Sequence, residues 1–468
     1  MHRQRWTPAT RLLVWIGLLS GVGCAPDGGP IRPHILLVSL DTVRPDRLGS
    51  YVPGVNDTPT LDRLAAEGLR FENAFSSSPW TLPGHASMLS GQPVSFHGAR
   101  YDPGGDVGIS WHRVALPGAD VPLLPELLSA AGYYTAGAIA VVWLQPRFGL
   151  ARGYDHYVAD VVDALGEPAD RMTDRALRLI EGRPPEAPFF LFLHYFDAHS
   201  PYTPPDPYRP EGVDHDGSIA KVELRVNSGA GRVSEAERRD LLSLYDGEIR
   251  FIDAQLGRVV ERLERDGIYD DTWIIVTADH GESFGAHDFF GHGLVTWNDV
   301  IRVPLIMKPP ASRPQRGVVD TPVQPRELVT TVLAELGLEK PAGMDGRNLL
   351  RRRFGRLRDD PVPVVAEAYR NLSMIRRFGS RWDRDERAWY EGSEKIVVRS
   401  DGSVDLFDWK NDPHETTSHV AGNLDRYDVL RNDLDAWVAH AVQAGVQGRA
   451  ARITPEDSLS LRALGYLD

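Results

Sequence analysis

Three apolar runs, each followed by polar residues capable of chemistry, constrain the fold of this chain more than any other feature. They cover residues 34–40, 188–194 and 272–277. Apolar runs without polar alternation are typical of strands buried on both faces of a parallel sheet. Asp41 follows the first run, His199 comes after the second, and Asp279 follows the third. Because parallel strands present their carboxyl ends at one edge, we expect these side chains to meet there.

The segments between the runs carry helical periodicity, and the C-terminal part of the chain changes character. The sequence therefore predicts an α/β fold with a mainly parallel central sheet sandwiched by helices. Residues 206–233 are polar and weakly patterned, which predicts a flexible insertion. Short strands and a terminal helix are expected after residue 360. We therefore expect a main domain over 34–360 and a smaller α+β subdomain over 361–468.

Composition limits the possible partners. The chain has 468 residues, of which 42% are hydrophobic and 25% charged, as in a globular protein with a large buried core. Its net charge of -13 argues against nucleic acid as a partner, because binding to a phosphate backbone needs a basic face.

The N-terminus has the pattern of an export signal. Three arginines precede the apolar run 12–19, and small residues then lead to Cys24, the one cysteine of the chain. The run is too short to span a bilayer. We expect residues 1–24 to be a signal and 25–33 to be a tether. Cys24 resembles the lipidated residue of a bacterial lipoprotein, which implies an exported, periplasmic or cell-surface protein held by an N-terminal lipid. A conventional cleaved signal with an incidental cysteine is the alternative.

Thr81 stands where a hydroxyl could act as a nucleophile. It lies two residues before Pro83, where a helix is expected to begin. Unpaired backbone N–H groups at the start of a helix bind anionic oxygens, so a nucleophile there could attack a tetrahedral oxyanion. The alternative is that Thr81 only caps the helix.

Asp279 and His280 are adjacent and follow an apolar strand, with Gly281 next. A turn at this point can direct both side chains to one metal ion. Asp41 ends the first apolar run, where an aspartate either caps a helix or joins such a site.

These motifs together resemble the sulfatase family of the alkaline phosphatase superfamily. The family's nucleophile motif, C/S-x-P-x-R, precedes a helix that ends in T-G. Here Gly91 lies eight residues after Pro83, which aligns Thr81 with the nucleophile and His85 with the arginine. Thr42 stands where the family has a second metal-binding aspartate. The resemblance implies an alkaline-phosphatase-like fold, with Asp41, Asp279, His280 and a Thr81 oxygen around a metal.

Carboxylate, hydroxyl and imidazole donors suit Ca²⁺, Mg²⁺, Mn²⁺ or Zn²⁺, and we expect one ion. His199 precedes Ser-Pro-Tyr and matches a substrate-contacting histidine of the family. The remaining histidines are candidates to position the anion, protonate the leaving oxygen or complete a second metal site. With His199, these are His85, His97, His287 and His292.

Threonine at position 81 decides which ester is expected. Sulfatases oxidise a cysteine or serine here to formylglycine, whereas the secondary alcohol of threonine could at most become a ketone. We therefore expect no formylglycine, and a threonine ester that water cleaves at the central atom. This favours a hydrolase of phosphate mono- or diesters within a sulfatase-like family, acting on a small-molecule, glycan or lipid ester. The alternatives are a phospho-headgroup transferase of the cell envelope, or a degenerate non-catalytic binding protein.

Overall fold

The computed structural model describes residues 32–101, 113–161, 166–353, 356–357, 362–445, 449–452 and 459–462. Pro33–Asp468 group as one compact unit and Met1–Arg32 as another. The expected signal with Cys24 and nearly all of the tether lie outside the described residues. Within the ranges described, no helix is both long and apolar enough to cross a membrane. The division of the chain at residues 360 and 361 stays a prediction.

An eight-stranded sheet forms the centre, in the order β14-β2-β13-β9-β1-β8-β6-β7. The three apolar runs are its three middle strands, and β1 lies between β8 and β9, parallel to both. Only β13 runs against its neighbours, being antiparallel to β9 and β2. The mainly parallel sheet is thus confirmed. The strand bounds are β1 His34–Leu40, β2 Leu69–Phe71, β6 Tyr134–Ala138, β7 His156–Val158, β8 Phe189–Tyr195, β9 Thr272–Thr277, β13 Leu305–Lys308 and β14 Gly317–Val319.

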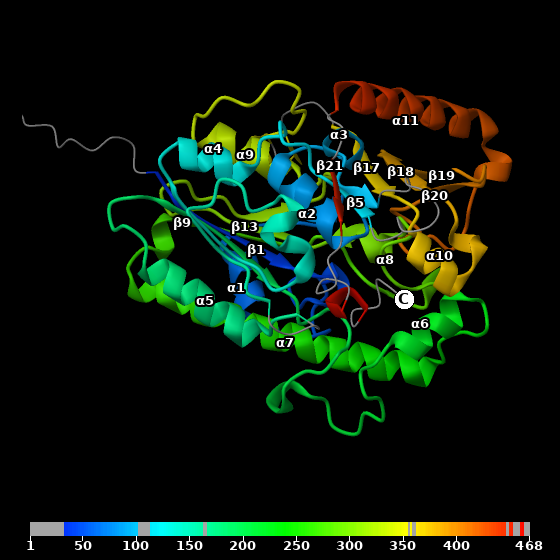
Figure 1. The fold of residues 1–468 in the computed structure, drawn as a ribbon, viewed down its shortest axis with the longest axis horizontal. Helices are drawn as coiled ribbons and strands as arrows, with labels where there is room; N and C mark the ends of the chain where they lie inside the picture. The colour runs from blue at the N-terminus through cyan, green and yellow to red at the C-terminus, as the bar shows by residue number, and fades with distance from the viewer. Residues whose placement is uncertain are drawn as a thin grey trace, which may run out of the picture. The chain divides into compact units, whose positions relative to one another are not determined.

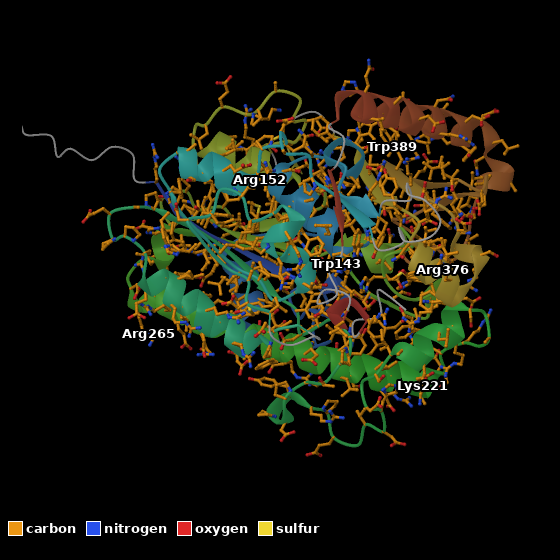
Figure 2. The ribbon with its side chains drawn as sticks, viewed as in Figure 1. Trp143, Arg152, Lys221, Arg265, Arg376 and Trp389 are labelled. Carbon is orange, nitrogen blue, oxygen red and sulfur yellow. The ribbon has the colours of Figure 1, made fainter. Side chains whose placement is uncertain are left out.

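Helices cover both faces of the sheet. Figure 1 shows α1 (Pro59–Glu67), α5 (Ala169–Glu181) and α7 (Glu235–Arg265) on one side of it. On the other side are α2 (Thr81–Ser90), α4 (Leu124–Ala130) and α9 (Glu327–Glu335). Each helix buries an apolar face against the core, as Ile249, Ile252 and Leu256 of α7 do. In Figure 2, Arg265 lies at the outer side of α7, whereas Trp143, which is fully buried, lies inside.

The C-terminal part forms a second, antiparallel sheet. Its strands are β17 (Val364–Ala368), β18 (Glu386–Glu391), β19 (Glu394–Arg399) and β20 (Val404–Asp408). Helix α11 (Leu424–Ala444) covers one face, where Leu430 and Leu434 pack on Trp389 and Ile396. This confirms the smaller C-terminal α+β subdomain. A third sheet joins β21 (Arg449–Arg452) to β5 (Arg113–Leu116) and β4 (Arg100–Tyr101). A strand late in the chain thus pairs with a much earlier segment.

The predicted flexible insertion at 206–233 is wrong for its second half. Helix α6 (Ala220–Asn227) lies there and buries Val222 and Val226. The Asn227 side chain exchanges two hydrogen bonds of 2.8 Å with the backbone of Phe290. Eight residues contain too few apolar positions for their helical period to stand out in the sequence.

The remaining short elements are η1 Pro45–Arg47, β3 Ala74–Phe75, α3 Val94–His97, η3 Val142–Leu144, η4 Pro146–Phe148, η5 Asp206–Tyr208, η6 Tyr269–Asp271, β10 Ser283–Phe284, η7 Ala286–Asp288, β11 Phe290–Gly291, α8 Asn298–Ile301, β12 Arg302–Val303, β15 Arg352–Arg353, β16 Arg356–Leu357, α10 Leu372–Phe378, η8 Ser380–Trp382 and η9 Val420–Gly422.

Candidate active site

Strand register brings the two aspartates together. Ser39 of β1 pairs with Thr277 of β9, and the strands are parallel. Asp41 and Asp279 each lie two residues beyond this pair, so they leave the sheet side by side at the same edge. His280 follows directly, and all three side chains are buried.

The side chains of Asp41, Asp279 and His280 form a cluster whose ligand atoms all lie within 4.8 Å of one another. His280 Nδ1 donates its hydrogen to the carbonyl of Gly281 at 2.9 Å, so Nε2 carries a lone pair. Nε2 lies 3.3 Å from Asp279 Oδ2 and 3.7 Å from Asp41 Oδ1. Two carboxylates and one ring nitrogen, all of them able to bind a cation, therefore face one another.

This donor set fits a divalent cation. Among the residues that the structure describes, Oδ1 of Asp41 and both carboxylate oxygens of Asp279 are buried and have no hydrogen-bond partner. Burial raises the pKa of Asp41 to about 8 and the pKa of Asp279 well above its usual range. Uncompensated buried carboxylates are costly, and a cation among them removes that cost. Thr42 offers no further donor there, because its hydroxyl lies 2.7 and 2.8 Å from the carbonyls of Asp41 and Ala198.

Thr81 joins this cluster from the other side. It is the first residue of α2, and its Oγ1 lies 3.4 Å from His280 Nε2. The N-cap residue of α2 is Trp80, and no side chain caps this helix. The Trp80 ring packs edge to face on the Trp143 ring, with ring centres 5.0 Å apart, and this contact fixes the start of the helix. At the other end Gly91 closes α2 in the left-handed conformation, with φ of 72°, which favours glycine.

His85 lies one turn further along α2 and contacts the backbone of Thr81. Its Nδ1 donates to the Thr81 carbonyl at 2.8 Å, so Nε2 accepts from the Ser39 hydroxyl at 2.9 Å. Burial lowers the pKa of His85 well below its usual value, so the ring is neutral. A neutral ring with both nitrogens occupied supplies no positive charge, unlike the arginine that the family has at this position.

Two supporting residues were not among the predicted site residues. His194 Nε2 donates to Asp41 Oδ2 at 3.1 Å, while its Nδ1 accepts from the Ala140 N–H. Such a donor fixes the orientation of a metal-binding carboxylate. The signal in the sequence is an ionisable residue inside an otherwise apolar strand. Glu282 is the second supporting residue. It lies two positions after His280 and is fully buried, and no pattern in the sequence distinguishes it.

His199 and His292 lie next to the cluster. The ring of His292 is centred 4.4 Å from that of His280 and 4.9 Å from that of His199. Glu282 orients His292, since it accepts from Nδ1 at 3.0 Å and from the Tyr202 hydroxyl at 3.1 Å. Although burial lowers the pKa of His292, Glu282 and the two aspartates raise it above its usual value.

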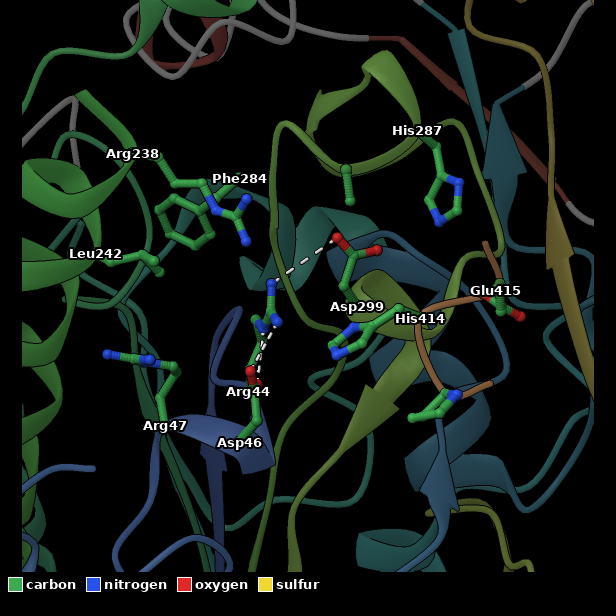
Figure 3. A pocket seen from close by; sticks show the side chains of 12 residues that line it. Arg44, Asp46, Arg47, Arg238, Leu242, Phe284, His287, Asp299, His414 and Glu415 are labelled. Carbon is green, nitrogen blue, oxygen red and sulfur yellow. Dashed lines mark hydrogen bonds and ion pairs between the residues drawn. The ribbon is translucent and has the colours of Figure 1, made fainter. Parts of the chain in front are cut away.

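His97 and His287 are not brought to the cluster. His97 is buried between the Ser87 hydroxyl, 2.9 Å from Nε2, and the N–H of Ala99, 3.0 Å from Nδ1. His287 stacks on Trp297 with ring centres 3.9 Å apart. Figure 3 shows it in a separate pocket, with Asp299 between His287 and Arg44.

Comparison with known proteins agrees with this geometry. The family model named Sulfatase matches residues 33–338. The uncharacterized sulfatase YidJ of Escherichia coli is 27% identical over 436 residues, with 82% of each chain covered. Among solved structures, the putative sulfatase yidJ from Bacteroides fragilis gives a TM-score of 0.70 at 19% identity, over 95% of this chain and 100% of that one. The phosphonate monoester hydrolase of Agrobacterium radiobacter gives 0.68 at 19% identity, over 88% and 96%. Because the family model covers well over half of its length, the chain belongs to the sulfatase family and is a sulfatase-like ester hydrolase of the alkaline phosphatase superfamily.

Proposed function

We propose that this protein hydrolyses phosphate mono- or diesters, with Thr81 as its nucleophile. The observation that carries the proposal is the Thr81 hydroxyl, which lies 3.4 Å from His280 Nε2 beside the two buried aspartates. Asp41, Asp279 and His280 are the proposed ligands of one divalent cation, Ca²⁺, Mg²⁺, Mn²⁺ or Zn²⁺. Such an ion supplies positive charge that lowers the pKa of a bound hydroxyl and stabilises the anionic group being transferred.

The residues of the chain have separate roles in the proposed reaction. Thr81 Oγ1 loses its proton and forms a bond to phosphorus, the bond from phosphorus to the ester oxygen of the substrate breaks, and that oxygen takes up a proton and leaves as the alcohol. Water then cleaves the Thr81–phosphorus ester and restores the hydroxyl. We assign contacts with the phosphoryl oxygens to His199 and His292, because the ring of His292 lies beside that of His280 and the ring of His199 lies beside that of His292. His85 acts as a positioning residue, since it contacts the carbonyl of Thr81.

The identity of residue 81 favours phosphorus over sulfur. A secondary alcohol cannot form the aldehyde hydrate that sulfatases use to expel sulfate, so its ester has to be cleaved by water at the central atom. Serine and threonine enzymes of the superfamily follow this route with phosphate. The similarity to a phosphonate monoester hydrolase supports a fold that accepts phosphorus esters.

Substitution at position 81 tests the proposal. We expect Thr81→Ala to lower kcat/KM for aryl phosphates and phosphodiesters by at least about 10³-fold, while Thr81→Ser keeps part of the activity. Intact-mass analysis should find residue 81 unmodified. The matched control is Ser234→Ala, because Ser234 caps α7 by accepting from the Glu237 N–H at 3.2 Å. Losing that cap costs about 1 kcal/mol of stability and no rate.

Two results contradict the proposal. One is full activity in Thr81→Ala. The other is turnover of sulfate esters that is much faster than turnover of every phosphorus ester tried. The panel therefore includes aryl phosphate, phosphodiester, phosphonate and sulfate substrates, each measured after chelation and after the addition of one metal at a time.

We also propose that the enzyme is exported and held at a membrane by a lipid on Cys24. The support is the order of arginines, apolar residues and small residues that leads to Cys24. The substrate would then be an ester that the enzyme meets outside the cytoplasm.

A further inference from the structure

A cavity next to the candidate active site is both acidic and aromatic. Its volume is about 290 Å³, and it lies between the loop after β8, the start of α5 and the middle of α7. Two phenylalanines, Phe196 and Phe251, line it together with the carboxylates of Asp197 and Glu248. Exposed residues, Thr203 among them, also line it, so the cavity is open to solvent.

In the part of the chain described, neither carboxylate forms an ion pair. Glu248 is only 3% exposed; its Oε1 accepts from the Thr203 N–H at 2.6 Å, and Oε2 has no partner among the residues described. Asp197 Oδ1 accepts from the Ala169 N–H at 3.0 Å, and its Oδ2 is buried with no partner in the described ranges of the chain. Burial raises the pKa of Glu248 to about 9 and that of Asp197 to about 7. The charge of Arg209 lowers the pKa of Glu248, but the two side chains form no ion pair in the part of the chain described.

Glu167, another buried carboxylate that lines the same cavity, has ion-pair partners. Glu167 is also buried, but it forms ion pairs with Arg171 at 2.7 Å and with Arg175 at 3.5 Å. In the part of the chain that the structure describes, Glu167 thus has ion-pair partners, whereas Asp197 and Glu248 have none. Ionising a buried carboxyl group is costly when it has no charged partner, so a cationic ligand that pairs with these two residues is favoured.

The walls select an organic cation over a metal ion. Aromatic rings attract ammonium groups through their faces, and carboxylates combined with aromatic rings are typical of sites for quaternary ammonium ligands. A metal ion needs several donors that converge on one point. In the described part of the chain, the one group of three such donors is Asp41, Asp279 and His280, outside this cavity.

The cavity and the proposed reaction site share a wall. His199 lines the cavity, and its ring stacks on Phe196 with centres 4.3 Å apart. The same ring is centred 4.9 Å from His292, which lies 4.4 Å from His280. A single small molecule can therefore place an ester at the cluster and a second group in the cavity.

We propose that this cavity is a subsite for an organic ammonium group, so that the substrate is an ester bearing a quaternary or primary amine. Recognition of the ammonium group depends on Glu248 and Asp197, with Phe196 and Phe251 as the apolar walls. The proposal rests on the proposed function for the ester half of the molecule. For the ammonium half, the subsite proposal does not depend on the proposed function, because binding of the ammonium group can be tested alone.

A pair of diesters that differ only in charge tests the subsite. The substrates are p-nitrophenyl choline phosphate and p-nitrophenyl 3,3-dimethylbutyl phosphate, in which carbon replaces the ammonium nitrogen. We expect kcat/KM to be about 10- to 100-fold higher for the choline ester. Glu248→Gln should bring this ratio close to one, and Asp197→Asn, as a second variant, should also lower it. The control Glu261→Gln removes an exposed charge from the same helix and should leave the ratio unchanged.

Calorimetry with choline alone separates failure of the subsite from failure of the proposed function. The wild-type enzyme should bind choline at least tenfold more tightly than 3,3-dimethylbutanol, and Glu248→Gln should lose this difference. Equal binding of the two alcohols, or equal turnover of the two diesters, overturns the subsite and leaves the phosphoesterase proposal standing. If neither diester is turned over but choline binds selectively, the subsite stands and the phosphoesterase proposal fails.

Discussion

Buried histidines around the candidate metal cluster each donate one ring hydrogen to a fixed oxygen. His85 donates to Thr81, His280 to Gly281 and His199 to Ser200, in each case to a backbone carbonyl. His194 donates to the Asp41 carboxylate instead. Because these donors are fixed, the protonated nitrogen of each neutral ring is fixed as well, and so is the direction in which its lone pair points. The site is therefore organised before any ligand arrives.

His194 offers a test of this organisation. Replacement by Phe removes the donor to Asp41, and we expect the affinity of the enzyme for its divalent metal to fall about 10- to 100-fold. Competition with a chelator measures this without any substrate. The matched control is His97→Phe, another fully buried histidine with both nitrogens occupied, which does not contact the cluster. If both variants lose metal equally, His194 has only a packing role.

Residue types and order were enough to indicate the centre of the site, but not its surroundings. Asp41, Asp279 and His280 follow apolar strands, and the side chains do meet. His97 and His287 were grouped with the other histidines because the sequence does not reveal which face of a loop or helix points at the cluster. Nothing in the sequence links His194 to the site, since its partner, Asp41, is 153 positions away.

At the scale of elements, the approach of helix α2 to the end of β9 holds Thr81 against the cluster. Gly84 makes this approach possible, because a Cβ atom there would lie 2.9 Å from the Asp279 carbonyl oxygen and 3.4 Å from its Cβ. Backbone atoms on both sides leave little room for adjustment.

Gly84→Ala should therefore move α2 away from β9 and displace the Thr81 hydroxyl. We expect kcat/KM to fall about 10- to 100-fold, because misplacement of a nucleophile by about 1 Å has effects of that size. The far-ultraviolet circular dichroism should stay native. Gly182→Ala is the control, since a Cβ there would meet its nearest neighbour, the Arg178 carbonyl, at 3.4 Å. Unchanged activity in Gly84→Ala would show that this contact does not position the nucleophile.

The sequence was more informative about the strands than about how they are joined. Long apolar runs predicted β1, β8 and β9 because burial on both faces leaves a clear record in composition. The reversed direction of β13 leaves none, since Leu305–Lys308 is as apolar as its parallel neighbours apart from Lys308. Helix α6 was missed because eight residues are too short to display a period.

At the scale of the whole molecule, the proposed lipid anchor decides where the enzyme meets its substrate. Cys24→Ser should release the protein from the membrane fraction or leave the precursor uncleaved, because the lipid has no other thiol to attach to in this chain. Fractionation followed by intact-mass analysis of the mature N-terminus measures both results. Thr81→Ala serves as the control, since it should stay in the membrane fraction. Unchanged membrane attachment of Cys24→Ser would exclude anchoring through this residue.

The position of β1 has a consequence for the timing of folding. Ile35 pairs with Phe190 on one side and with Trp273 on the other, so β1, the first strand of the described residues, is synthesised well before either of its partners. At typical rates of translation, the wait for the second partner lasts roughly 10 to 50 s. Pairing between such distant segments also makes folding slow. Until it is complete, an apolar strand with both edges open can pair with other chains. We therefore expect the nascent chain to need a chaperone, or a translocation channel where it is exported as proposed, to keep β1 from aggregating.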